Sequence, residues 1–183
     1  MTRGDIKGRA AEREVAKLCQ RWWAKLEPDC EFCRTPLSGG WSDSTVRAHF
    51  RASGDLMTTA ETWPFTTEVK RRECWNVERL FTGKNSPAWA WWRQAVDQAQ
   101  EEGGVPMLWA RKNQYRPGQP AFPWLVMLPI DYVLSLDAKL PRPDVVWQSE
   151  LLLSSDIDFN DELPALWFAD RLLEVHPRKF VGK

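Results

Sequence analysis

The sequence predicts an α/β fold, and three observations lead to that class. Residues 6–26 lack proline and repeat apolar side chains with a helical period, and residues 65–70 alternate as a strand does. A second helical segment, residues 86–103, is followed by an apolar run. With 183 residues the chain can bury one substantial core. We therefore expect one core domain, residues 1–115, and a C-terminal extension, residues 116–183, packed on it.

The first predicted helix, Ile6–Leu26, carries an acid on its apolar side. At about 100° per residue, Glu12 lies inside the apolar arc, whereas Glu14 lies outside it and is expected to be an ordinary surface acid. A carboxylate turned toward a core needs a metal, a basic partner or a water network. Glu12 is therefore a candidate functional acid, with a frayed edge of the arc or an arginine partner as the alternative. The arc consists of Ala11, Val15, Leu18, Cys19, Trp22, Trp23 and Leu26.

The next segment, Cys30–Thr35, is predicted to be the first strand. Strand alternation would direct Cys30 and Cys33 to opposite faces, which disfavours zinc binding by this Cys-x-x-Cys pair. No second pair of this spacing occurs. We expect reduced thiols and no disulfide framework.

The main chemical signal lies in Gly54-Asp55-Leu56 and Glu68-Val69-Lys70. In a strand Glu68 and Lys70 share one face and Val69 faces the other, while Asp55 on an adjacent strand would supply a second acid. Two carboxylates and a substrate phosphate are sufficient to hold Mg²⁺. Lys70 would orient the attacking water or neutralise developing charge. These groups are typical of a phosphodiesterase. The alternative is that Glu68 and Lys70 form a solvated face of cross-strand charges without a catalytic role.

The second helix is predicted to begin at Ser86-Pro87 and to end at Gly103-Gly104, since these residues are typical of helix caps. Gln94 and Gln98 lie one turn apart beside its buried stripe. Either glutamine could join the site or face solvent, and the sequence leaves both open. The run Pro106–Ala110 then predicts the returning strand.

The C-terminal extension carries no catalytic motif. Its patterns predict a strand at Trp124–Leu128, a short helix at Ile130–Leu136 and a closing helix at Leu163–Val175. Trp22, Trp92 and Trp109 lie on predicted buried stripes and are expected to be structural.

Four strings together resemble the archaeal-type Holliday junction resolvases, a branch of the PD-(D/E)XK nuclease superfamily. Residues 7–15 are similar to the opening helix, residues 34–40 to the Arg-x-Pro-x-Ser-Gly loop, and Gly54-Asp55-Leu56 and Glu68-Val69-Lys70 to the acidic strands. The resemblance spans about residues 3–113. A longer stretch between Ser38 and Asp55 departs from the family pattern.

The resemblance implies a restriction-endonuclease-like core, in the order α-β-β-β-α-β, with a central mixed sheet flanked by helices. It implies a homodimer that cuts four-way junctions and other branched DNA with Mg²⁺ or Mn²⁺. Glu12, Asp55 and Glu68 would be the metal ligands, and these three acids together with Lys70 and Ser38 would be the catalytic residues.

Contacts with DNA are expected from basic side chains near the acids and from one tryptophan next to a glycine pair. Formal net charge is zero, but residues 1–120 carry 19 Lys and Arg against 15 Asp and Glu, and residues 121–183 carry 6 against 10. The expected DNA-binding residues are Lys7, Arg9, Arg13, Arg34, Arg71, Arg72 and Trp41.

Two other functions remain open from the sequence. One is a nuclease of the same superfamily that acts on flaps, ends or single strands in repair or replication. The other is a branched-DNA-binding module without turnover. The sequence has no apolar run of membrane-spanning length and no secretory signal, so we expect a soluble, cytoplasmic protein.

Overall fold

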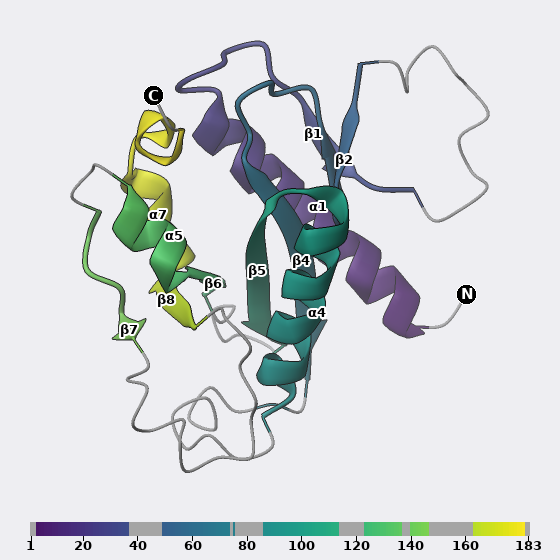
Figure 1. Ribbon diagram of the computed structural model, residues 1–183. Helices are drawn as coiled ribbons and strands as arrows, with labels where there is room; N and C mark the ends of the chain where they lie inside the picture. The colour runs from purple at the N-terminus through teal and green to yellow at the C-terminus, as the bar shows by residue number, and fades with distance from the viewer. Residues whose placement is uncertain are drawn as a thin grey trace.

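Helices flank a mixed β-sheet, which confirms the predicted α/β class (Figure 1). The computed structural model describes residues 3–36, 49–73, 75, 86–113, 123–136, 140–146 and 163–181. None of the helices in these ranges is long and apolar enough to cross a membrane. The elements are α1 (Arg3–Trp23), β1 (Phe32–Arg34), β2 (Arg51–Ser53), β3 (Leu56–Thr58), β4 (Phe65–Arg72), α4 (Pro87–Glu102), β5 (Val105–Lys112), β6 (Leu125–Pro129), α5 (Ile130–Ser135), β7 (Val145–Val146), β8 (Pro164–Phe168), α7 (Ala169–Glu174) and a 3₁₀ helix, η1 (Pro177–Phe180).

The strands form two sheets that meet at β4. The larger sheet has the order β4-β5-β6-β8-β7, with β4 and β5 parallel and the remaining neighbours antiparallel. The smaller sheet has the order β1-β3-β2 and is antiparallel. A bridge between Gly54 and Thr67 connects it to the edge strand β4. The order α1-β1-β3-β4-α4-β5 follows the predicted core, and β2 is an additional strand formed by the end of the long stretch that precedes Asp55.

The larger sheet is covered on both faces, as Figure 1 shows for α4 on one side and α1 on the other. Alternate residues of β5 divide between two apolar clusters. Met107 and Trp109 pack with α1, whereas Leu108 and Ala110 pack with α4. A strand buried on both faces is expected to be apolar, as residues 105–110 of β5 are.

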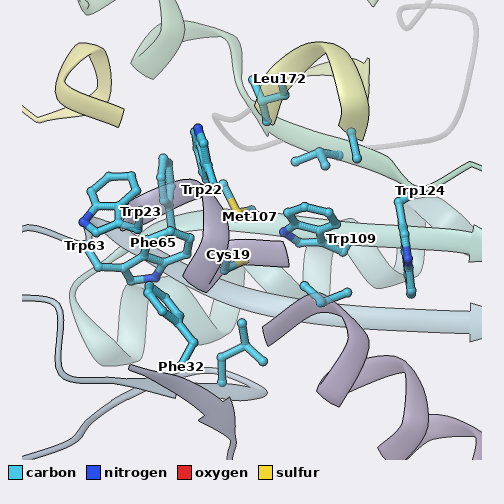
Figure 2. Packing of buried hydrophobic residues seen from close by; sticks show 14 of the residues in the cluster. Cys19, Trp22, Trp23, Phe32, Trp63, Phe65, Met107, Trp109, Trp124 and Leu172 are labelled. Atoms are coloured by element: carbon cyan, nitrogen blue, oxygen red, sulfur yellow. The ribbon is translucent and has the colours of Figure 1, made fainter. Parts of the chain in front are cut away.

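Tryptophans fill much of the α1 side of the core (Figure 2). The rings of Trp23 and Trp63 meet edge to face with centroids 4.8 Å apart, an arrangement that aromatic pairs favour. Trp22, Trp92 and Trp109 are buried, which agrees with the structural role predicted for them.

The second helix begins and ends where its capping residues predict. The Ser86 hydroxyl accepts a hydrogen bond from the Ala88 amide, and Pro87 occupies the first turn. At the other end Gly103 adopts a left-handed conformation, with φ of 78°, and its amide donates to the Ala99 carbonyl at 2.8 Å. These ends set the position of the α4 face that lies over β4.

The C-terminal part confirms two predicted elements and corrects a third. Strand β6 and helix α5 lie close to their predicted positions. The predicted helix Leu163–Val175 is wrong, because Pro164–Phe168 forms β8 between β6 and β7, and only Ala169–Glu174 is helical. A short apolar run that is buried on both faces does not distinguish a strand from a helix by its period. The domain boundary near residue 115 stays a prediction, while β6, β8 and β7 extend the sheet that contains β4 and β5.

Candidate active site

Asp55 is held at the tip of a tight hairpin against the edge of β4. Gly54 and Asp55 form the two-residue connection between β2 and β3, with Ser53 paired to Leu56. Gly54 has φ of 75°, and a Cβ atom there would lie 2.3 Å from the Thr67 carbonyl oxygen. The Asp55 amide donates to that same oxygen at 2.7 Å. Only glycine therefore fits between the turn and β4, and this close approach sets the position of Asp55.

The carboxylates of Asp55 and Glu68 lie beside each other at this edge. Asp55 Oδ2 accepts a hydrogen bond from the Val69 amide at 2.8 Å. Glu68, which exposes only 3% of its surface, forms an ion pair with Lys70. This pair places both side chains on the same side of β4, as strand alternation predicts. Gln94 Nε2 of α4 donates to Glu68 Oε1 at 3.2 Å.

The ionisation of both acids is perturbed by the site. Burial, then the charge of Asp55, raises the pKa of Glu68 to about 6, against the opposing effect of Lys70. The pKa of Asp55 is also raised, chiefly by burial, while its hydrogen bond from Val69 and the charge of Lys70 lower it. Like charges in a partly buried site disfavour full ionisation, and a bound cation would reverse that effect.

Glu12 approaches this pair from α1. Burial and then the charge of Asp55 raise its pKa, whereas Arg34 opposes the shift. Arg34 Nη1 of β1 lies 3.5 Å from Glu12 Oε2. Glu12 is thus an inward-facing acid, as the helical wheel predicts, and Arg34 is a charged partner.

The structure corrects the expectation for Glu14, which is no ordinary surface acid. Arg111 of β5 donates to both of its carboxylate oxygens, at 2.6 Å each. Trp124 Nε1 donates to Glu14 Oε1 at 3.1 Å. The helical wheel could not predict this pair, because it uses only the residues of one helix and Arg111 lies 97 positions away.

Helix α4 contributes a further acid that sequence reasoning missed. Glu102 Oε2 accepts a hydrogen bond from the Gly54 amide at 2.9 Å, and Gln98 Nε2 donates to Glu102 Oε1 at 3.1 Å. The two glutamines therefore have different partners: Gln94 donates to Glu68, and Gln98 donates to Glu102, which supports the hairpin. No local signal marks Glu102, since its role depends on the contact between the end of α4 and a distant turn.

The family comparison agrees with this geometry. A family model described as "phage putative PDDEXK endonuclease" matches residues 4–155. The chain belongs to this family. No curated protein and no solved structure gives a significant match.

Membership in the PDDEXK endonucleases confirms the superfamily and points to a nuclease. It also agrees with the restriction-endonuclease-like fold of the core. The specific resemblance to junction resolvases is a finer statement than this match supports, and it stays a prediction.

PD-(D/E)XK nucleases generally use divalent metal ions, so the fit of the acids to such an ion matters. Within the residues that the structure describes, no three His, Cys, Asp or Glu side chains are gathered tightly enough to form a metal site. Asp55 and Glu68 nevertheless supply two neighbouring carboxylates, and in the same residues Asp55 Oδ1 and Glu68 Oε2 make no hydrogen bond. Oxygen donors of this kind fit Mg²⁺ or Mn²⁺.

Some of the predicted DNA-binding side chains interact with other residues of the chain, and others are exposed. Lys7 forms an ion pair with Glu73. The Arg71 guanidinium donates to Asn113 Oδ1 through Nε at 3.1 Å and Nη2 at 2.8 Å. Arg13 and Arg72 are exposed.

Three other predicted residues need separate mention. Arg9 is half-buried, and its charge lowers the pKa of Glu12, although burial and Asp55 raise it more strongly. Ser38 and Trp41 lie outside the described residues. Their predicted roles in catalysis and DNA contact stay predictions.

Proposed function

We propose that this protein is a divalent-metal-dependent endodeoxyribonuclease that cleaves branched DNA, with the four-way junction as its preferred substrate. The observation that carries the proposal is the cluster of Asp55, Glu68 and Lys70 at the edge of β4. Family membership supports the nuclease part of the proposal. The choice of branched DNA rests on the resemblance of residues 7–15 and 34–40 to junction resolvases.

Asp55 and Glu68 are the residues proposed to hold Mg²⁺ or Mn²⁺. Mg²⁺ is commonly bound through one or two carboxylates together with water and substrate phosphate. Glu12 would join them once Arg34 turns to a phosphate of the DNA. Such an ion, when bound, would supply Lewis acidity and would lower the pKa of a coordinated water.

The chain's own groups complete the chemistry. To the Lys70 ammonium, which pairs with Glu68, we assign the orientation of the attacking water and the balancing of negative charge on the phosphate. The Val69 amide and the Gly54 turn keep the Asp55 carboxylate in position. The Gln94 amide group restricts the rotation of Glu68. Together these contacts hold the reacting groups in place before DNA binds.

A homodimer would suit this substrate, because two equivalent sites could address opposed strands of a four-way junction. Contacts with the phosphate backbone are proposed for Arg9, Arg13, Arg34, Arg72 and the segment that contains Ser38. The formal net charge of zero means that such contacts must come from local basic residues.

The proposal is tested with labelled four-way junction, flap and linear duplex, each with Mg²⁺ and with EDTA. Wild type is expected to nick the junction symmetrically only with Mg²⁺, and Asp55→Asn to lose cleavage by at least about 100-fold. Asp97→Asn is the matched control, because Asp97 is an exposed acid of α4.

Other outcomes identify the alternatives. Preferential cleavage of flaps or ends would refute junction resolution and support a different nuclease of this superfamily. Junction binding that is equal in wild type and Asp55→Asn, without cleavage of any substrate, would refute the enzyme and support a binding module.

A further inference from the structure

Helix α1 is attached to the larger sheet by a charged cluster separate from the acids at β4. The Glu14 carboxylate accepts hydrogen bonds from both terminal nitrogens of Arg111, at 2.6 Å each, and from Trp124 Nε1 at 3.1 Å. The Arg111 guanidinium carbon lies 4.3 Å from the centroid of the Trp124 ring. The Arg111 side chain exposes only 8% of its surface. A bidentate pair of this kind fixes direction as well as distance.

The helix places this cluster and the site acid on opposite sides of its axis. Residues 12 and 14 are separated by about 200° of rotation in a helix of 3.6 residues per turn. Glu12 accordingly points to Arg34 of β1, and Glu14 points to Arg111 of β5. A rotation of α1 that turned Glu12 away from Asp55 would also break the bidentate pair of Glu14.

Residues 7–16 of α1 bury no bulky side chain that would interlock with its neighbours. The buried side chains of this segment are small, namely Ala11, Val15 and Ala16. The bulky buried residues, Trp22 and Trp23, lie at the far end of the helix. Small side chains bury little area and interlock weakly. In this segment Lys7 pairs with Glu73 and Glu12 with Arg34, and the Glu14 pair adds a bidentate contact that fixes direction.

We propose that Glu14 and Arg111 are positioning residues that fix the rotation of α1 so that Glu12 faces the acids at β4. The inference rests on the proposed function insofar as Glu12 serves the metal site. Neither residue contacts the Asp55 or Glu68 carboxylate, and both act through the helix. The cluster thus extends the functional machinery across the sheet to Trp124.

The first test requires no metal. Amide hydrogen exchange of residues 7–16 is compared in wild type, Glu14→Gln and Arg111→Lys. The lysine keeps the positive charge but cannot form the bidentate pair of hydrogen bonds. Both variants are expected to exchange about tenfold faster in this segment, while residues 19–23 keep their protection. Lys17→Gln is the control, because it removes an exposed charge from the same helix. Unchanged protection of residues 7–16 in both variants would overturn the proposal.

The second test measures Mn²⁺ affinity by electron paramagnetic resonance of the free ion. Glu14→Gln is expected to weaken binding about tenfold, as loss of a supporting contact does in other metal sites. In a Glu12→Gln background the same change should weaken binding by less than about twofold, because Glu14 acts through Glu12. An equal loss in both backgrounds would overturn the proposal.

The two proposals fail in different ways. Equal Mn²⁺ affinity of wild type and Asp55→Asn would refute the metal site itself, and the exchange experiment alone would then decide the role of Glu14. Loss of Mn²⁺ binding in Asp55→Asn with unchanged affinity in Glu14→Gln would refute only the positioning role.

Discussion

Replacement of Gly54 by alanine tests the close approach that fixes Asp55. The substitution meets two separate penalties. An L residue at φ of 75° costs about 1–2 kcal/mol. The new Cβ atom would also lie 2.3 Å from the Thr67 carbonyl oxygen and 2.9 Å from its amide nitrogen, so the turn must move away from β4.

That movement lengthens the 2.7 Å hydrogen bond from the Asp55 amide to Thr67, worth about 1 kcal/mol. The free energy of unfolding should therefore fall by about 2–3 kcal/mol in total. DNA cleavage should fall by about 100-fold at temperatures where the variant stays folded, because Asp55 is displaced by about 1 Å.

Gly103→Ala provides the matched control. Gly103 has nearly the same backbone conformation, with φ of 78°, but an added Cβ atom there meets nothing within 4 Å. It should lose only about 1–2 kcal/mol and keep full cleavage activity. Both variants are measured by urea unfolding, followed by cleavage of labelled DNA. Equal destabilisation of the two variants would refute the role assigned to the contact with Thr67.

Two further predictions concern charged groups. Glu14→Ala should cost about 3 kcal/mol because it leaves the Arg111 side chain, 8% exposed, without its partner. Arg111→Met should cost only about 1 kcal/mol, because the remaining Glu14 carboxylate is 42% exposed and can be hydrated. A larger loss of stability for Arg111→Met than for Glu14→Ala in urea unfolding would contradict this explanation. Burial and the charge of Asp55 raise the pKa of Glu68 from 4.5 to about 6, so protonation of Glu68 stabilises the folded state. This contribution is fully present below pH 4.5 and is lost as the pH rises through about 6. The free energy of unfolding should accordingly decrease over this interval in wild type and vary less in Glu68→Gln, and an identical slope in the variant would exclude Glu68 as the source.

Several parts of the fold and site were accessible from the sequence because local patterns encode them. The caps at Ser86 and Gly103 set the ends of α4, and strand alternation predicted the shared face of Glu68 and Lys70. The helical wheel isolated Glu12 because an acid within an apolar arc is an anomaly that a single helix reveals.

The failures have a common physical cause, since each depends on a partner far away in the sequence. Glu14 pairs with Arg111 and Glu102 with Gly54, and neither helix records the identity of its neighbour. Residues 164–167 are buried on both faces of the sheet, so the apolar run lacks the alternation that would mark it as a strand. Gln94 and Gln98 could not be separated, since only the position of β4 decides which of them reaches Glu68.

The pairing of β1 and β2 on opposite sides of β3 has a practical consequence. The chain leaves this small sheet after Arg34 and returns to it at Arg51, and both attachment points are fixed by the same central strand. Whatever length of polypeptide joins them, the hairpin tip is delivered to the same place. A change of chain length in this interval therefore leaves Asp55 in place against β4, so the substrate contacts predicted for Ser38 and Trp41 can be varied independently of the acids.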